Sequence, residues 1–339
     1  MLNVHFSFLP PGDKIGFFRR CVSRLALPLL ASVALNTASA QSYPTQPIRL
    51  VVPFSAGGGA DATARVLAEQ LGRRLGQPIV VENRPGASAG VGALAVAHAT
   101  PNGYTLLVGT STLATNSLLL PTPGLDIVKD FEFIGQIGRI DLLLVVSPQL
   151  KVSNLRGFLD MMRSQPDKLT FGSPGTGSGG HLGVELFKLV TKTRAVHIPY
   201  KGDSAALADL IGGHTNFQMC APVVCAPRIQ DGSLKALGIA SKHRSKLLPN
   251  VPTLAEEGVA GVEAGAWWYL AAPKGTPADI INKLNTALNQ VTSNENYRSR
   301  QLAIGVETES STTPAAVRDA LLSEIEKWRP VVKAAVLGN

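Results

Sequence analysis

Short apolar runs alternate with amphipathic segments along most of the chain after residue 46. The run Ile48–Val52 is continuous and apolar, which predicts a buried strand, and residues 60–75 carry apolar side chains at helical spacing. The same alternation continues through strands expected at residues 78–83, 105–109, 142–148, 194–200 and 234–241, a strand at the start of residues 169–192, and a strand plus turn at 266–277, before a helical tail. Continuous apolar strands that alternate with helices indicate a parallel sheet covered on both faces. We therefore expect an α/β fold with mostly parallel sheets.

Two Gly-rich stretches interrupt this pattern at equivalent places, each between a predicted strand and a predicted helix. They read PFSAGGGAD at residues 53–61 and SPGTGSGGH at residues 173–181. Ligands of such sheets bind at the carboxyl ends of the strands, and the first turn of a helix offers free N–H groups to an anion. A tight turn with Ser55 or Asp61 as a helix cap is the alternative for a single loop. The presence of two long loops favours a bound carboxylate or phosphate.

The first forty residues have the three-part pattern of an export signal. Four Lys/Arg precede the apolar run Leu25–Leu35, and Ala-Ser-Ala at residues 38–40 provides small residues for cleavage. The apolar run is too short to span a bilayer, which needs about 20 residues. We expect cleavage near Ala40, a periplasmic location and no membrane insertion of the mature chain.

The composition narrows the classes of partner. The formal charge of the whole chain is +8, and about +5 remains after the predicted cleavage. Because no basic block remains and no aromatic residues lie within the densest patch (241–246), we expect no nucleic-acid binding. Cys220 and Cys225 are the cysteines left after cleavage, and we expect ordinary buried side chains in preference to a local disulfide.

Enzymatic readings of the Gly-rich loops lack support in the residues. Gly57, Gly59 and Ala62 fit a dinucleotide fingerprint, but four residues separate its first glycine from the strand. A hydrolase site at Ser178 and His181 is not supported either. The stretch around Ser178 lacks the first glycine of the G-x-S-x-G nucleophile elbow, and no acid is placed to orient the histidine. No metal-binding motif is present. We expect neither an enzyme nor a cofactor.

Residues 43–93, YPTQPIRLVVPFSAGGGADATARVLAEQLGRRLGQPIVVENRPGASAGVGA, closely resemble the opening of the tripartite tricarboxylate transporter substrate-binding proteins, the Bug receptors. The resemblance continues through HIPYKG (197–202), LKALGIAS (234–241), LPNVPTLAEEG (248–258) and GTPADIINKLN (275–285). It implies a two-lobed, type II-like periplasmic binding protein with a ligand cleft between the lobes. The resemblance also implies that the protein binds a small organic acid for delivery to a tripartite tricarboxylate-type transporter. The alternatives are a ligand-sensing receptor of the same family that acts in signalling, and an exported α/β enzyme.

The resemblance also implies boundaries and site residues. We expect lobe 1 at residues 41–141 plus 269–339, lobe 2 at 142–268, a monomer, and contacts to membrane transporter subunits. The predicted ligand-binding residues come from the two loops and from the ends of other strands. They are Phe54, Ser55, Ala56, Gly57, Gly58, Gly59, Asp61, Ser111, Thr112, Asn116, Thr176, Gly177, Ser178, His181, Tyr200, Lys201, Cys220 and Trp267.

Two positions depart from the usual pattern of this family. Leu113 occupies a position where many members have histidine, and Cys220 one where many have an acid. Both changes predict a less polar pocket, and therefore an acid with an apolar or aromatic body. In the strand that contains Trp267 and Trp268, neighbouring side chains point to opposite faces, so we expect one tryptophan at the cleft and one in the core.

Overall fold

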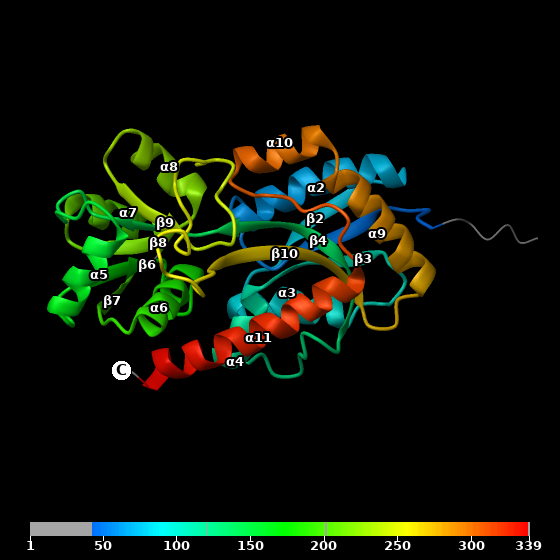
Figure 1. Cartoon of the computed structure of the whole chain (residues 1–339). Coiled ribbons are helices and arrows are strands. Elements are labelled where there is room, and N and C mark those ends of the chain that lie inside the picture. Colours follow the sequence, from blue (N-terminus) through cyan, green and yellow to red (C-terminus); the bar gives the residue numbers. More distant parts are fainter. Residues whose placement is uncertain (1–42, 120, 201, 338–339) are drawn as a thin grey trace, which may run out of the picture. The chain divides into compact units, whose positions relative to one another are not determined.

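The computed structural model describes residues 43–119, 121–200 and 202–337, and its chain builds two five-stranded sheets flanked by helices (Figure 1). The predicted signal segment and Lys201 lie outside these residues. We refer to the part built on the first sheet as lobe 1 and to the part built on the second as lobe 2. The residues at which the lobes divide stay a prediction.

The first sheet has the strand order β2-β1-β3-β10-β4. β1 pairs in parallel with β2 and with β3, whereas β10 is antiparallel to both β3 and β4. The strands are β1 (Ile48–Val52), β2 (Ile79–Asn83), β3 (Thr105–Thr110), β4 (Phe131–Asp141) and β10 (Gly265–Pro273).

The second sheet repeats this plan in the order β7-β6-β8-β5-β9. β6 is parallel to β7 and β8, and β5 is antiparallel to β8 and β9. The strands are β5 (Leu143–Val146), β6 (Thr170–Ser173), β7 (Val196–Pro199), β8 (Phe217–Cys220) and β9 (Lys235–Ile239). Thus β1 and β6, the strands before the two Gly-rich loops, occupy equivalent positions.

The expected α/β architecture is confirmed, but the sheets are mixed. The three strands on one side of each sheet are parallel, as the pattern predicts, and the other pairings are antiparallel. The reason lies in the connections between the lobes. β4 leads through Leu142 directly into β5, and β10 enters the first sheet from lobe 2, so neither β5 nor β10 arrives through a right-handed helical crossover.

Helices cover both faces of the first sheet. In Figure 1, α2, α9 and α10 lie on one side of it, and α3, α4 and α11 lie on the other. In lobe 2, α6 packs against β6 and β8, as does α7. The helices are α2 (Gly59–Leu75), α3 (Gly90–Ala97), α4 (Thr112–Leu119), α5 (Leu155–Ser164), α6 (Gly179–Thr191), α7 (Asp203–Gly212), α8 (Pro222–Gln230), α9 (Ala278–Thr292), α10 (Glu295–Ala303) and α11 (Pro314–Leu337), with a 3₁₀ turn η1 (Ala87–Ala89).

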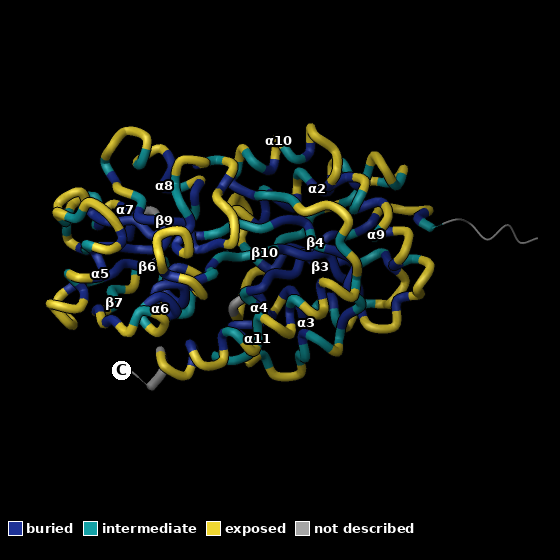
Figure 2. The backbone as a smooth tube through the Cα atoms, viewed as in Figure 1, coloured by how far each residue is buried: buried dark blue, intermediate teal, exposed yellow. Residues whose placement is uncertain are grey.

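The strands inside both lobes are mainly buried (Figure 2), and along β5 the buried side chains alternate between two cores. Leu144 and Val146 belong to a core cluster shared with α5 and α6, and Leu143 and Val145 belong to one shared with α7 and α8. All four side chains are fully buried. The continuous apolar run therefore reflects a strand covered on both faces.

The helix α11 contributes to both lobes. Its first half places Val317 and Leu321 in the core of lobe 1, and its second half places Trp328 and Val331 in the α5/α6 core of lobe 2. The two lobes are therefore joined where β4 passes into β5, where the chain returns from lobe 2 into β10, and by a helix, which makes α11 part of the connection between them.

The strand β4 was not predicted because glycines interrupt its apolar pattern. A Cβ at Gly135 would lie 2.9 Å from Leu288 of α9, and a Cβ at Gly138 would lie 2.7 Å from Val306. These close approaches exclude larger side chains, so the glycines record neighbours that the local pattern does not reveal. The strand β8 and the helices α4, α8 and α10 were also missed.

The expectation for the two cysteines is wrong, because Cys220 and Cys225 form a disulfide across the start of α8. Their Cα atoms are 6.4 Å apart and both residues are buried. Two cysteines five residues apart can form a bridge only where the backbone brings their Cα atoms close together. Here β8 ends at Cys220 and the chain turns at once into α8, which provides that geometry.

Candidate ligand-binding site

The first Gly-rich loop connects β1 to α2. Gly57 has φ +83°, which favours glycine, and Gly58 is the N-cap in an extended conformation without a side-chain cap. The residues Ser55–Gly59 are exposed, and a Cβ at Gly59 would meet no atom within 4 Å. The N–H groups of the first turn of α2 have no acceptor within the helix, so they face an open approach.

The carboxylate of Asp61 is turned into this loop. Its Oδ2 accepts the N–H of Gly57 at 2.8 Å and Nε of Arg65 at 3.0 Å, and its Oδ1 accepts Nδ2 of Asn83 at 2.9 Å. The Arg65 hydrogen bond and the other donors lower the pKa of Asp61 to about 2, against a smaller opposing effect of burial. Asp61 is 3% exposed, and with a pKa of about 2 it is ionised at pH 7, with both carboxylate oxygens hydrogen-bonded.

The second Gly-rich loop connects β6 to α6. Gly175 and Gly177 have φ of +136° and +80°, and Thr176 between them is exposed. Ser178 is the N-cap of α6, and its Oγ accepts the N–H of His181 at 3.3 Å. A side-chain cap is therefore present in this loop, whereas neither Ser55 nor Asp61 caps α2.

The imidazole of His181 lies beneath the second loop. Its Nδ1 accepts the N–H of Gly177 at 3.1 Å, and its ring stacks on that of His197 with centroids 4.0 Å apart. Burial lowers the pKa of His181 to about 4, and Lys188 adds to the effect. The pKa of His197 is also lowered to about 4, mainly by burial and then by His181. Both histidines are therefore neutral at pH 7.

The predicted residues after β3 are brought together with β10. Ser111 accepts the N–H of Trp267 at 3.2 Å through its Oγ and donates its own N–H to the Trp267 carbonyl at 3.0 Å. Thr112 donates its N–H to the hydroxyl of Thr110, and Asn116 is buried on α4. Farther along α4, Leu119 lies next to the second loop, because a Cβ at Gly177 would be 3.3 Å from its Cδ1.

The remaining predicted residues are held by other contacts. The hydroxyl of Tyr200 donates to Oδ2 of Asp209 at 2.7 Å, and burial together with Asp209 raises its pKa to about 12. The carbonyl of Phe54 accepts Nδ2 of Asn83 at 3.1 Å, while its ring packs against the core of lobe 1. Cys220 is disulfide-bonded and offers no thiol. Lys201 is outside the described residues.

The burial of Leu113 and Cys220 bears on the prediction that these two residues make the ligand pocket less polar. Leu113 is 3% exposed in the core of lobe 1, and Cys220 is 1% exposed in the α7/α8 core of lobe 2. The argument that these residues give the pocket an apolar wall therefore loses its basis. Trp268 is in the core at 6% exposure and Trp267 is partly buried, so the expectation of one core tryptophan is confirmed.

Three supporting residues were missed by sequence reasoning. Asn83 and Arg65 hold Asp61, and Ser173 contacts Nε2 of His197 through its Oγ at 2.7 Å. A polar residue at the last position of an apolar strand, as in Asn83 and Ser173, was the signal that could have identified two of them.

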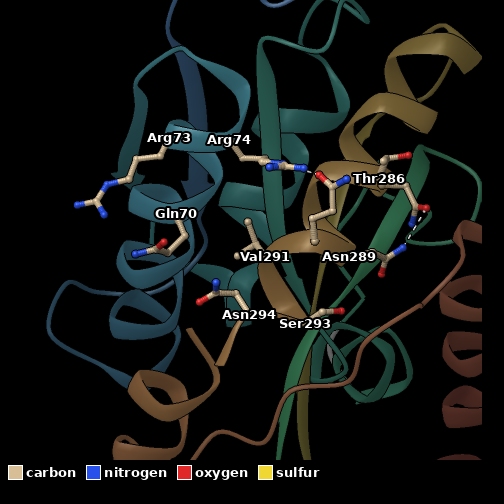
Figure 3. A pocket seen from close by; sticks show the side chains of 10 residues that line it. Gln70, Arg73, Arg74, Thr286, Asn289, Val291, Ser293 and Asn294 are labelled. Atoms are coloured by element: carbon tan, nitrogen blue, oxygen red, sulfur yellow. Dashed lines mark hydrogen bonds between the residues drawn. The ribbon is translucent and has the colours of Figure 1, made fainter. Parts of the chain in front are cut away.

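A cavity of about 800 Å³ between α2 and α9 contains none of the predicted residues (Figure 3). Several of its polar side chains are already engaged. Arg74 extends toward α9 and hydrogen-bonds Gln290, Arg73 turns away toward Glu69, and Asn289 donates to the Thr312 carbonyl. This cavity therefore offers little for a ligand, in contrast to the first turns of α2 and α6.

A second cavity, of about 320 Å³, lies beside the strands that connect the lobes. Trp267 lines it together with Arg139, Asp141 and Lys327. Its charges are paired, since Arg139 and Lys327 contact Asp141 and Glu324. Chemically, the Gly-rich loops differ from both cavities because they present backbone N–H groups and hydroxyls, which suit an oxyanion.

Comparison with known proteins identifies the family. The model of the tripartite tricarboxylate transporter family receptor matches residues 63–337. The chain belongs to this family. It is 37% identical over 297 residues to the protein BugT of Bordetella pertussis, covering 87% of this chain and 91% of that protein.

Two similar proteins have been solved with organic acids. One is Rpa4515 of R. palustris with adipate, at 34% identity and a TM-score of 0.74, covering 86% of this chain and 98% of the other. The other is MatC of Rhodopseudomonas palustris with bound malate, at 31% identity and a TM-score of 0.71, covering 86% and 100%. The receptor family consists of periplasmic solute-binding proteins, and the two-lobed α/β fold expected from the sequence is confirmed.

Across residues 43–119, 121–200 and 202–337, no helix is both long enough and apolar enough to cross a bilayer.

Proposed function

We propose that this receptor captures a small organic acid between its lobes and delivers it to a membrane transporter of the tripartite tricarboxylate type. The observation that carries the proposal is the pair of Gly-rich loops, which follow the equivalent strands β1 and β6 and open the helices α2 and α6. The adipate and malate of two relatives have the carboxylate chemistry that such loops suit.

In this proposal the carboxylate is held mainly by backbone donors. Gly58 and Gly59 supply N–H groups from lobe 1, and Gly179 supplies one from lobe 2, since the N–H of Ser178 is already donated to the Gly175 carbonyl. Thr176 is exposed in the second loop and adds a hydroxyl donor. Each helix dipole favours the negative charge at its N-terminus by about 0.3–1 kcal/mol. Closure of the lobes around the ligand would combine both contributions.

The remaining predictions belong to the same proposal. Residues 1–40 act as an export signal, lobe 1 comprises residues 41–141 plus 269–339, and lobe 2 comprises 142–268. The protein is a monomer that binds and releases its ligand without catalysis and without a cofactor. Sequencing the N-terminus of the secreted protein tests the cleavage near Ala40.

A thermal-shift screen of the purified protein against small carboxylates, including adipate and malate, tests the binding function. At 100 times its Kd, a ligand stabilises the folded protein by about 2.7 kcal/mol. For a chain of this size that corresponds to a rise in Tm of roughly 5 °C. If no acid raises Tm while an amine or a sugar does, the proposed function is wrong.

The variant Gly58→Val tests whether the first loop carries the ligand. Gly58 has φ −83° and ψ 173°, which valine adopts, and its Cβ would meet only the Ser55 carbonyl at 3.7 Å. The fold should therefore persist while the side chain covers the N–H groups. Gly157→Val places the same side chain in the first turn of α5, outside both Gly-rich loops, and serves as the control. If the ligand raises Tm equally in both variants, the first loop does not hold the ligand and is only a turn between β1 and α2.

A further inference from the structure

The same type of hydrogen bond occurs in each of the two Gly-rich loops, and the sequence pattern does not predict it. In each, a glycine with positive φ donates its N–H to the side chain four residues later. Gly57 donates to Oδ2 of Asp61 at 2.8 Å, and Gly177 donates to Nδ1 of His181 at 3.1 Å. Both acceptors lie in the first turn of the following helix and are almost fully buried, at 3% and 6% exposure.

The position of the acceptor explains why it can reach the loop. A side chain in the first turn of a helix leans toward the helix N-terminus, over the residues that enter it. An acceptor there ties the left-handed turn to the helix. The peptides between the glycine and the helix are then fixed on both sides, and these are the peptides that we propose to bind a carboxylate.

In lobe 1 the acceptor is itself held by two other residues. Asn83, at the end of β2, donates to Oδ1 of Asp61 and also to the Phe54 carbonyl in the loop. Arg65, one turn farther along α2, donates to Oδ2. The carboxylate therefore has no oxygen left without a donor, which argues against a direct contact with a ligand ammonium.

In lobe 2 the acceptor is held by ring stacking. His181 stacks on His197 from β7 and, at 6.1 Å between centroids, on Phe171 from β6. The charged groups that face it are Glu185, whose Oε1 is 3.9 Å from Nε2, and Lys188 on the same helix. With Nδ1 accepting from Gly177, the ring proton belongs on Nε2, on the side of Glu185.

We propose that Asp61 and His181 are positioning residues of the binding loops, which fix the backbone donors for the ligand instead of contacting it. This inference rests on the proposed function, because the loops are its binding surface. It also makes the two lobes chemically different. The anchor of lobe 1 is an anion, whereas the anchor of lobe 2 exists only while the imidazole is neutral, since a proton on Nδ1 would face the Gly177 N–H with a second donor.

Three variants of lobe 2 separate positioning from general stability. Asparagine at residue 181 places an oxygen close to the position of Nδ1, so His181→Asn keeps the acceptor, and His181→Leu removes it at similar volume. Asn154→Ala removes a comparable bond, because Asn154 caps α5 by accepting the Gly157 N–H at 2.9 Å. It is the matched control for lost stability in the same lobe.

The first readout needs no ligand. In the ¹⁵N-labelled protein at pH 7, His181 should carry its proton on Nε2, and the Gly177 amide should be protected from hydrogen exchange. His181→Leu should speed that exchange at least about five-fold, the equivalent of one net hydrogen bond, and His181→Asn should leave it within two-fold. A proton on Nδ1, or unchanged exchange in His181→Leu, would overturn the inference.

The second readout measures binding of succinate and of aspartate, which differ by an ammonium group. His181→Leu should weaken binding at least about five-fold, with His181→Asn and Asn154→Ala within two-fold of the wild type. In lobe 1, Asp61→Asn should weaken both probes equally. A selective loss of aspartate binding would mean that Asp61 contacts the ligand. If the wild-type protein binds no acid at all, the proposed function is wrong. The hydrogen-exchange measurement on the Gly177 amide still decides whether His181 fixes the loop of lobe 2.

Discussion

Acidification should destabilise this protein through the stacked pair His181 and His197. The pKa of each imidazole is lowered from 6.5 to about 4, chiefly because burial disfavours the charged form. The unfolded chain therefore binds these protons at a pH where the folded chain does not. Stability contributed by a neutral buried histidine is complete above pH 6.5 and is lost as the pH falls toward 4.

The magnitude follows from the number of protons taken up on unfolding. At pH 5 an unfolded histidine is almost fully protonated, and one with a pKa near 4 is about one-tenth protonated. Each residue then contributes a slope of about 1.2 kcal/mol per pH unit, and the pair contributes about 2 kcal/mol per pH unit. Other groups that face the pair are Glu185 and Lys188, and Glu185 opposes the shift of His197.

Urea unfolding followed by circular dichroism between pH 7 and pH 4.5 measures this slope. The reference is the double variant His181→Asn/His197→Gln, which keeps an amide near each hydrogen-bonding ring nitrogen and cannot titrate. The free energy of unfolding of the wild type should fall relative to the variant by about 2 kcal/mol per pH unit near pH 5. Parallel curves for the two proteins would refute the reasoning, and so would a wild type that gains relative stability on acidification.

Three further changes test the packing around the connecting strands. Tyr269→Phe should raise the free energy of unfolding by about 1 kcal/mol in urea titrations, because the buried hydroxyl has no hydrogen-bond partner among the described residues. Gly109→Ala should lower the free energy of unfolding by about 2 kcal/mol, since its Cβ would overlap the Tyr269 ring. Combining it with a smaller residue at 269 should restore part of the lost stability, which checks the cause. Asn285→Ala should lower the free energy of unfolding by about 2 kcal/mol, because Nδ2 of Asn285 donates to the Ile134 and Thr312 carbonyls at 2.6 and 2.8 Å and the Ile134 carbonyl would lose this donor; a change below 0.5 kcal/mol would contradict this.

The sequence predicted those parts of the fold whose signal is local. The strand β1 has the predicted bounds, and α2 begins one residue before the expected start. Both Gly-rich loops were placed between the right strand and the right helix. These features depend on apolar periodicity and on glycine conformation, which a short stretch of chain specifies by itself.

Features that depend on distant neighbours were missed or misjudged. The glycines of β4 hide a strand because α9 and Val306 pass close to it, and no local pattern records that approach. The antiparallel pairing of β5 and β10 follows from the chain passing between lobes. The disulfide depends on the turn after β8, and two amino-acid letters five positions apart do not determine it.

The sequence by itself determined that this chain is an α/β protein with two loops suited to an anion, and its resemblance identified the receptor family. Only the tertiary structure decided what Asp61 and His181 do. A side chain's partner depends on the elements folded around it, and here Asn83 from β2 and His197 from β7 hold the two acceptors in place. The sequence therefore predicted which loops matter, and the packing of the lobes determined which atoms in them remain available to a ligand.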